Sequence, residues 1–235
     1  MALKEEPERR ETAFYGRRKG HKLRARQADV FAELLPRLRI DPAMVTDPAL
    51  LFPGKVTDVW LEIGFGGGEH LLAQALANPT IGFIGCEPFI NGMAKLLSEI
   101  ETRDITNIRL YDNDAMDLLG VLPEKSIGRA FLLYPDPWPK RRHNKRRFVS
   151  DESLTLLGRL IRPGGVFRFA SDIDHYVGWT LVRAMRSGVF QWTAKEAVDW
   201  RLPWLDWPGT RYEAKAKREG RTPSYLTFKR QITAS

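Results

Sequence analysis

The sequence of 235 residues is poor in the residues that build disulfides and metal centres. Cys86 is its only cysteine, which excludes an intramolecular disulfide. Its four histidines, His21, His70, His143 and His175, are scattered, and with a single cysteine they make no metal-ligand spacing. We therefore expect a protein that binds no metal and that resides in the cytoplasm.

Long apolar runs are also missing. No run of eighteen apolar residues occurs, so no membrane span is expected. The start, Met1 to Arg10, is charged and lacks the apolar stretch of a signal peptide. With 43% apolar residues, the chain has the composition of a globular protein, and its length suits one large α/β domain with a short appendage.

Positive charge is concentrated in two places. The net charge is +8; residues 1–26 contribute +5, residues 140–147 contribute +6, and the remaining 201 residues sum to −3. Two basic segments on a slightly acidic body are typical of contact with a polyanion such as nucleic acid. A basic tail alone can equally serve solubility. The internal segment is harder to explain that way, because it follows a candidate active-site loop.

Strand and helix patterns alternate from residue 56 onward. Short apolar runs predict strands at 59–63, 81–86, 108–111, 130–134 and 166–170, and helical periodicity predicts helices at 69–77, 90–101, 115–122, 151–161 and 175–185. Alternation of this kind predicts a doubly wound, mostly parallel α/β sheet. Two further strands, at 190–195 and 225–229, fit an antiparallel hairpin at one sheet edge. We expect a flexible basic arm over residues 1–26 and a single domain over 27–235, with the first helix at 27–38.

An acidic residue stands at or near the end of every predicted parallel strand. These residues are Glu62, Glu87, Asp112 with Asp114, Asp136 and Asp172. Single acids at such positions commonly cap turns or helices. Acids at all five ends favour a ligand pocket, because ligands of open parallel sheets bind beyond the carboxyl ends of the strands. Such a pocket suits a ligand with cationic groups and hydroxyl donors.

A glycine-rich turn, Glu62 to Gly68, follows the first strand, and Gly64 and Gly66 let its backbone approach a ligand closely. Dinucleotide-binding folds share such a turn. A pyrophosphate placed here would be repelled by Glu62 and Glu69, against the usual attraction of a helix N-terminus for anions. S-adenosylmethionine carries a sulfonium and an ammonium instead of phosphate. Glu87 could accept its ribose hydroxyls and Asp114 its adenine amino group, so the sequence favours a methyl donor over a dinucleotide.

The most specific stretch is Tyr134-Pro-Asp-Pro-Trp-Pro-Lys140, after the fourth strand. Its three prolines fix φ and stiffen the loop, which orients Asp136 and Trp138. A rigid turn with a buried tryptophan is the simplest interpretation. An aromatic ring and a carboxylate held at a pocket mouth also suit a nucleobase, which can stack on the ring and donate to the acid. The basic segment that follows could hold backbone phosphates.

Over about residues 55–230 the chain resembles the bacterial tRNA (guanine-N7)-methyltransferase family. The resemblance rests on three segments, Glu62–Gly68, Tyr134–Phe148 and Thr210–Glu213. A looser likeness in residues 15–21 carries no functional residue. Membership would imply a Rossmann-like class I methyltransferase fold and methyl transfer from S-adenosylmethionine, leaving S-adenosylhomocysteine, to N7 of the variable-loop guanosine at tRNA position 46. It would also imply tRNA as partner, with the protein a monomer or homodimer and not bound to a membrane.

The resemblance also implies roles for individual residues. It implies cofactor contacts by Glu62, Glu87, Asp114 and Asp136, with Asp136 also catalytic, beside the glycines 64 and 66 of the turn. It implies substrate contacts by Lys140, Asp172, Thr210, Arg211, Tyr212 and Glu213. It implies RNA contacts by Arg142, His143, Asn144, Lys145, Arg146 and Arg147. The residues of Thr210–Glu213 alone predict only a capping box that opens a helix ending near Glu219.

Two other classes of protein stay open. Another N-methyltransferase, acting on rRNA or protein, would share the fold. A protein substrate needs no dense basic loop, however, and amino-nitrogen methylases carry Asn/Asp-Pro-Pro-aromatic where this chain has Asp136-Pro-Trp-Pro139. A non-catalytic RNA-binding protein on the same fold would have no reason to keep a carboxylate at each strand end. Measured binding of S-adenosylmethionine separates it from the enzymes.

Overall fold

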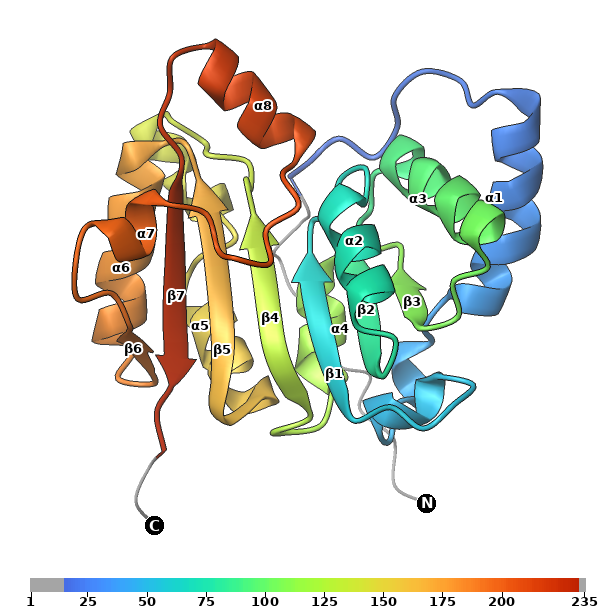
Figure 1. Cartoon of the computed structure of the whole chain (residues 1–235), viewed down its shortest axis with the longest axis horizontal. Coiled ribbons are helices and arrows are strands. Elements are labelled where there is room, and N and C mark those ends of the chain that lie inside the picture. The colour runs from blue at the N-terminus through green and yellow to red at the C-terminus, as the bar shows by residue number, and fades with distance from the viewer. Residues whose placement is uncertain (1–14, 233–235) are drawn as a thin grey trace, which may run out of the picture.

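The computed structural model describes residues 15–232. Seven strands form one sheet in the order β3-β2-β1-β4-β5-β7-β6 (Figure 1). Their bounds are β1 Asp58–Ile63, β2 Ile81–Cys86, β3 Ile108–Tyr111, β4 Ile127–Leu133, β5 Ile161–Ser171, β6 Phe190–Trp192 and β7 Ser224–Arg230. The first five pair in parallel, whereas β7 is antiparallel to both neighbours. The predicted doubly wound, mostly parallel sheet with an antiparallel edge is confirmed.

Helices cover both faces of this sheet. They are α1 Ala25–Leu38, α2 Glu69–Ala77, α3 Ile90–Arg103, α4 Ala115–Val121, α5 Asp151–Leu160, α6 Asp174–Arg186, α7 Val198–Arg201 and α8 Arg211–Arg218, with the 3₁₀ turns η1 Pro42–Met44, η2 Pro48–Leu51 and η3 Arg141–Arg146. In Figure 1, α1, α2 and α3 lie over the β1–β3 half, and α4 and α5 lie behind the sheet. The strand order changes direction between β1 and β4, and the parallel strands point to the upper end of the view.

Burial explains why each parallel strand carries apolar residues on both faces of the sheet. Leu61, Ile84, Ile108, Ala130 and Phe167 are all fully buried, because both faces of the sheet are covered there. Each predicted element between residues 25 and 186 forms, with ends shifted by no more than a few residues. The largest shift is in β5, which begins at Ile161 rather than 166, since it pairs early with Ile127 across a bulge.

The antiparallel edge differs in one respect from a simple hairpin. β6 ends at Trp192, earlier than predicted, and residues 193–223 with α7 and α8 separate it from β7. In Figure 1 the segment from α7 to α8 crosses in front of β7, β5 and β4, a part of the sheet that α1, α2 and α3 leave uncovered. Trp204 and Trp207 of this segment pack on Phe131 and Tyr225. The segment therefore takes the place of a covering helix.

The N-terminal arm was predicted to span residues 1–26. Residues 1–14 lie outside the described residues, and α1 begins at Ala25 rather than at residue 27. The intervening stretch contacts the start of α3. The Ile90 N–H donates to the carbonyl of Arg18 (3.0 Å), and the Asn91 amide bonds Gly20 N (2.8 Å) and the carbonyl of His21 (2.7 Å). The part of the arm next to the domain is thus fastened to α3.

Candidate functional site

A cavity of about 520 Å³ opens at the carboxyl ends of the parallel strands. Its wall is built from the turns that follow β1, β2, β3 and β4, from the end of η3 and from the start of α8. The predicted site residues that line it are Gly64, Gly66, Glu87, Asp114, Asp136, Lys145, Arg146, Arg147 and Tyr212. One cavity thus brings together residues that are up to 148 positions apart in the sequence.

The glycine turn supplies backbone rather than side chains to the cavity. Gly64, Gly66 and Gly68 have φ of 70°, 57° and 77°, in the left-handed region that favours glycine. A Cβ at Gly66 would lie 3.0 Å from the Tyr212 hydroxyl oxygen. The turn therefore depends on glycine for its conformation, and at Gly66 also for the close approach of α8.

Glu87 is the most buried acid of the cavity, with 8% of its surface exposed. Its carboxylate accepts hydrogen bonds from the N–H of Gly66 (2.7 Å) and of Phe89 (2.9 Å). Burial raises the pKa of Glu87 to about 7, aided by the charges of Asp136 and Glu62 and opposed by those two hydrogen bonds. Each carboxylate oxygen keeps a second lone pair that can accept from a ligand hydroxyl.

Asp114 serves as a helix cap and lines the cavity. Its carboxylate accepts from the N–H of Met116 (3.0 Å) at the start of α4, and both residues contribute to the cavity wall. The capping role and the predicted ligand role are thus compatible here.

Asp136 lies exposed at the mouth of the cavity, in the loop after β4. The partial loss of solvent around it raises the pKa of its carboxyl group. Tyr134 (φ 50°) and Trp138 (φ 41°) on either side adopt the left-handed region, which is uncommon for large side chains. The loop that carries Asp136 is therefore held in a defined, strained shape.

Next to Asp136, three side chains from distant segments form an aromatic and cationic cluster. The Arg146 guanidinium lies 5.0 Å from the ring centres of both Tyr15 and Trp138, and the two rings meet edge to face at 6.4 Å. Such contacts are favourable because the ring faces carry partial negative charge. The cluster joins the N-terminal segment to η3 at the mouth of the cavity.

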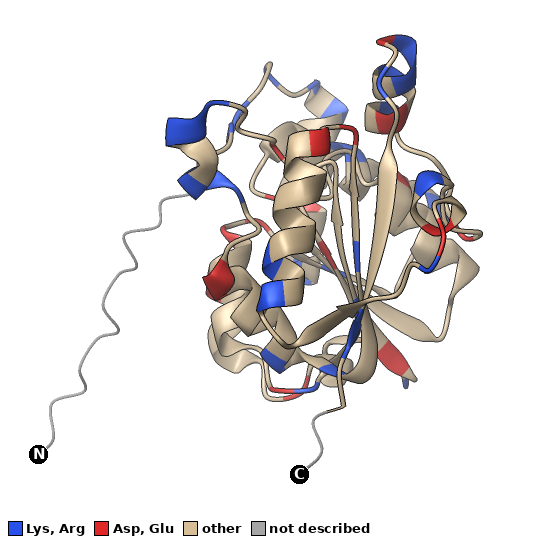
Figure 2. Ribbon diagram, turned by 90° about the vertical axis from the view of Figure 1, so that its left-hand side faces the viewer, with Lys and Arg blue, Asp and Glu red and all other residues tan. Residues whose placement is uncertain are grey.

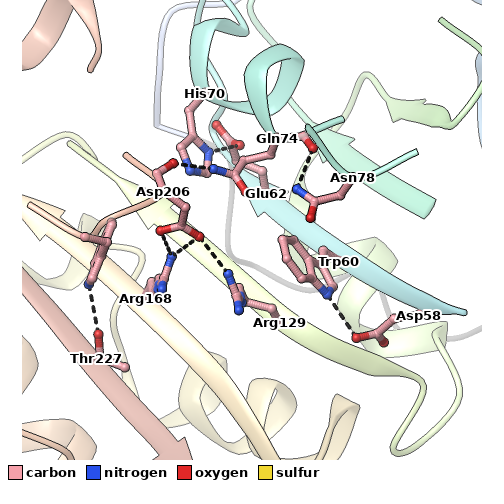
Figure 3. A network of polar contacts seen from close by, with 11 residues as sticks. Asp58, Trp60, Glu62, His70, Gln74, Asn78, Arg129, Arg168, Asp206 and Thr227 are labelled. Carbon is pink, nitrogen blue, oxygen red and sulfur yellow. Dashed lines mark hydrogen bonds and ion pairs between the residues drawn. The ribbon is translucent and has the colours of Figure 1, made fainter. Parts of the chain in front are cut away.

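Glu62 is not among the residues that line the cavity, although the next residue, Ile63, is. It is 3% exposed, and its Oε2 lies 2.6 Å from Nδ1 of His70, which is itself 2% exposed. Figure 3 shows the pair side by side. His70 packs in turn on Phe131 and Trp207, with ring centres 4.6 and 5.3 Å away. A cofactor contact by Glu62 stays a prediction.

A polar network fastens the segment between α7 and α8 to the sheet (Figure 3). Asp206 accepts from the Arg168 guanidinium (2.7 and 2.8 Å) and from Arg129 (3.1 Å), on β5 and β4. Its backbone carbonyl accepts from the Gln74 amide (2.7 Å) on α2. These contacts fix the direction in which the chain enters α8.

The Thr210–Glu213 segment caps α8 through only half of the predicted box. The Thr210 hydroxyl accepts from the Glu213 N–H (3.2 Å), but the Glu213 side chain turns inward and accepts from Trp207 (2.8 Å) and Tyr225 (2.6 Å). Lys217 also lies 2.5 Å from it. Burial raises the pKa of Glu213, but these three partners outweigh burial and lower it. Of the four residues, Tyr212 alone lines the cavity.

Two further predicted substrate residues lie beside the cavity rather than on its wall. Asp172 accepts from Arg221 (2.5 Å), which also contacts Glu219. Lys140 is exposed and directly precedes η3. Substrate contacts by Lys140 and Asp172 stay predictions.

The six predicted RNA-binding residues do not share one environment. Arg142 and Lys145 are exposed, whereas His143, Asn144 and Arg146 are partly buried. Arg147 is 3% exposed and lies beneath the Asp136 loop. In Figure 2 the η3 turn is blue apart from its middle residues, and it projects at the same end of the molecule as α8.

Some cavity residues were not predicted from the sequence. They are Tyr15, Phe89, Met116, Phe148 and Ser150, among others. Tyr15 belongs to the basic N-terminal arm, and each of the others lies within three residues of a predicted site residue. Apolar side chains give no signal in the sequence that separates a ligand wall from a core. No metal-binding group of His, Cys, Asp and Glu occurs among residues 15–232, and no helix in that range is long and apolar enough to cross a membrane.

Comparison with known proteins agrees with this geometry. Residues 57–225 match a family described as putative methyltransferase. A protein of Agrobacterium fabrum named tRNA (guanine-N(7)-)-methyltransferase is 59% identical over 221 residues, which cover 93% of this chain and 95% of that protein. One of the same name from Mesorhizobium japonicum is 52% identical over 233 residues, 98% of this chain and 100% of that protein.

Solved structures support the same fold at much lower identity. The 16S rRNA methyltransferase KamB superposes with a TM-score of 0.52 at 17% identity, covering 75% of this chain and 89% of its own. The aminoglycoside resistance methyltransferase NpmB1 gives 0.51 at 17% identity, covering 74% and 88%. The fold, the cavity at the strand ends and the full-length relatives agree, and the chain belongs to the putative methyltransferase family, among the enzymes named tRNA (guanine-N(7)-)-methyltransferase.

Proposed function

We propose that this enzyme transfers a methyl group from S-adenosylmethionine to N7 of a guanosine in tRNA, the variable-loop guanosine at position 46, in the cytoplasm. The observation that carries the proposal is the composition of one cavity. Glu87, Asp114 and Asp136 line it beside the glycine turn, and Lys145 and Arg146 stand at its mouth. Acids inside suit a cationic donor, and cations at the mouth suit an RNA backbone.

The residues present fit S-adenosylmethionine better than a dinucleotide. Glu87 is buried with lone pairs to spare, as acceptance of two ribose hydroxyls requires. Asp114 could accept from the adenine amino group, with Phe89 and Met116 on the apolar part of the same wall. Bound here, S-adenosylmethionine supplies an electrophilic methyl group on a sulfonium. A pyrophosphate would meet these carboxylates, and the cation nearest the glycine turn, Arg211, is already paired with Glu69.

Asp136 has an electrostatic role in this proposal. Guanine N7 carries an in-plane lone pair and no proton, so methylation at N7 needs no general base. Positive charge grows on the purine during the reaction, and a fixed carboxylate nearby stabilises that charge more than the neutral base. Asp136 stands at the mouth on a loop stiffened by three prolines, where it can act without reorganising.

Methyl transfer to three tRNA transcripts tests the proposal. The first carries guanosine at position 46, the second adenosine, and the third 7-deazaguanosine, which replaces N7 by C–H with little change of shape. We expect labelled methyl in the first only, with all three bound at similar affinity. Transfer to the deaza transcript at the normal rate would show that another atom is the target. Binding of all three without any transfer would identify a non-catalytic RNA-binding protein.

A further inference from the structure

Arg147 differs from the rest of the basic segment in where its side chain lies. It is 3% exposed, whereas Arg141, Arg142 and Lys145 are exposed. Its Nε donates to the carbonyl of Pro137 (2.8 Å), and Nη2 makes a longer contact with the carbonyl of Trp138 (3.5 Å). The guanidinium therefore faces the loop that carries Asp136 and not the solvent.

The opposite side of the same guanidinium is closed by α6. Nη2 lies 2.9 Å from Nδ1 of His175, and the group sits over the rings of Tyr176 (4.8 Å) and Trp179 (5.0 Å). No carboxylate of residues 15–232 forms an ion pair with it. Arg147 also lines the cavity, but with only 3% of its surface exposed it offers almost no contact area to an RNA phosphate at the protein surface.

The loop has few backbone donors of its own. Pro135, Pro137 and Pro139 lack an N–H, so every second residue between Pro135 and Pro139 cannot donate a backbone hydrogen bond. Trp138 is in addition held at φ 41°, a conformation that persists only when surrounding contacts impose it. Arg147 contacts the carbonyl of the preceding residue, Pro137, and the carbonyl of Trp138 itself.

We infer that Arg147 is a positioning residue: it fixes the carbonyls of Pro137 and Trp138 and thereby sets the place of Asp136, and it contacts no phosphate. The inference rests on the proposed methyl transfer, and it reverses the RNA-contact role expected for Arg147 from the sequence. The remaining cations of η3 keep that role. A displacement of about 1 Å in a catalytic group can cost 100-fold in rate, so loss of this support should lower turnover rather than tRNA affinity.

The test compares Arg147→Ala, Arg147→Lys and Arg142→Ala in the full chain. For both Arg147 variants we expect kcat to fall about 10- to 100-fold. The salt slope, which is the slope of log tRNA affinity against log salt concentration, should stay unchanged. Arg142→Ala should instead lower the magnitude of that slope by about 0.9, the value for one phosphate contact on a duplex. Low concentrations of guanidinium chloride should restore kcat of Arg147→Ala, and equal potassium chloride should not.

The outcomes separate this inference from the proposed function. A wild-type protein that binds tRNA but transfers no methyl group refutes both. Wild-type transfer together with a slope reduced by about 0.9 in Arg147→Ala would make Arg147 a phosphate contact and overturn the inference alone. Unchanged kcat in Arg147→Lys, or a loss in Arg147→Ala that guanidinium leaves unrestored, would do the same. If Arg147→Ala does not fold, kcat of Arg147→Lys decides, because lysine keeps the charge but not the paired donors of the guanidinium.

Discussion

Two elements rich in Lys and Arg contribute to the wall of the cavity, η3 and α8. They differ in whether their cations are paired with carboxylates. No carboxylate of residues 15–232 forms an ion pair with Arg141, Arg142 or Lys145 of η3. On α8, three of the four cations lie beside a carboxylate: Arg211 beside Glu69, Lys217 beside Glu213 and Lys215 beside Glu219. Figure 2 shows the same contrast, with η3 mostly blue and α8 banded in blue and red.

The contrast shows that a count of basic residues is a poor guide to nucleic-acid contact. A cation that is paired within the protein is already partly neutralised by its carboxylate, and a contact with a phosphate would break that ion pair. An unpaired cation releases counterions when it meets the phosphate backbone, which drives binding. We therefore propose that the cations of η3 bind the tRNA backbone and that α8 positions Tyr212.

The largest expected effect concerns a charge that lies between the two segments. Asp136→Asn keeps the shape of the loop and removes the carboxylate charge, so kcat should fall on the order of a hundredfold, while tRNA affinity is not weakened. Single-turnover methyl transfer at saturating tRNA measures this. The matched control is Asp112→Asn, another acid after a strand, which pairs with Arg39 (2.6 Å) away from the cavity. Comparable losses in both variants would contradict a special role for Asp136.

The next largest effect tests the comparison directly. Replacing Arg141, Arg142 and Lys145 of η3 by Ala should lower the magnitude of the salt slope of tRNA binding by about 3, because each phosphate contact on a duplex contributes about 0.9. Replacing Arg211, Lys215 and Lys217 of α8, which each lie beside a carboxylate, by Ala removes the same formal charge and should leave the slope nearly unchanged. Equal changes in both triple variants would break the distinction between the segments.

The sequence predicts the carboxyl ends of the five parallel strands well, but it predicts poorly where individual side chains point. Apolar runs and glycine positions are local signals, so the five parallel strands and the turn at Gly66 follow from them. Arg147 looks like its neighbours in sequence, yet it is buried, because α6 and the proline loop close over it only in the folded chain. The pairing of Glu62 with His70 is likewise set by how α2 packs beside β1.

The covering segment between α7 and α8 is a second feature that local patterns do not reveal. Trp204 and Trp207 carry no helical or strand periodicity, and their role depends on Asp206 reaching Arg129 and Arg168 across the sheet. Such contacts join residues 38 to 77 positions apart. The predicted capping box forms only in part for the same reason: Thr210 caps α8, but the Glu213 side chain accepts from Trp207 and the buried Tyr225 instead of the helix end.

The pH dependence of S-adenosylmethionine binding tests Glu87, which lies inside the cavity and belongs to neither η3 nor α8. Glu87 has its pKa raised to about 7, and only its ionised form can accept from both ribose hydroxyls. Affinity for S-adenosylmethionine should therefore fall as pH drops through 7, about tenfold between pH 8 and pH 6. Calorimetry of the wild type and of Glu87→Gln gives the comparison, because titration of the ligand cancels between them. Parallel pH profiles would show that Glu87 does not titrate in this range or does not hold the ribose.

The smallest expected effect tests whether a paired cation of α8 serves the fold. Arg211 places Nε and Nη2 at 2.7 and 2.6 Å from Oε1 of Glu69, the first residue of α2, with the arginine side chain 47% exposed. Exposed pairs of this kind contribute about 0.2–1 kcal/mol, so Arg211→Ala should lower the free energy of unfolding by that amount and leave the salt slope unchanged.

Gly67→Ala offers a second route, because a Cβ there would lie 1.7 Å from Arg211 Nη2 and would displace the guanidinium without removing its charge. A double-mutant cycle of Arg211→Ala with Glu69→Gln isolates the pair from the bond that Lys95 makes to the same oxygen (2.8 Å). Zero coupling energy combined with a lower kcat/KM for tRNA would mean that Arg211 contacts the substrate, as the resemblance implied, and would place α8 beside η3 as a second RNA-binding segment.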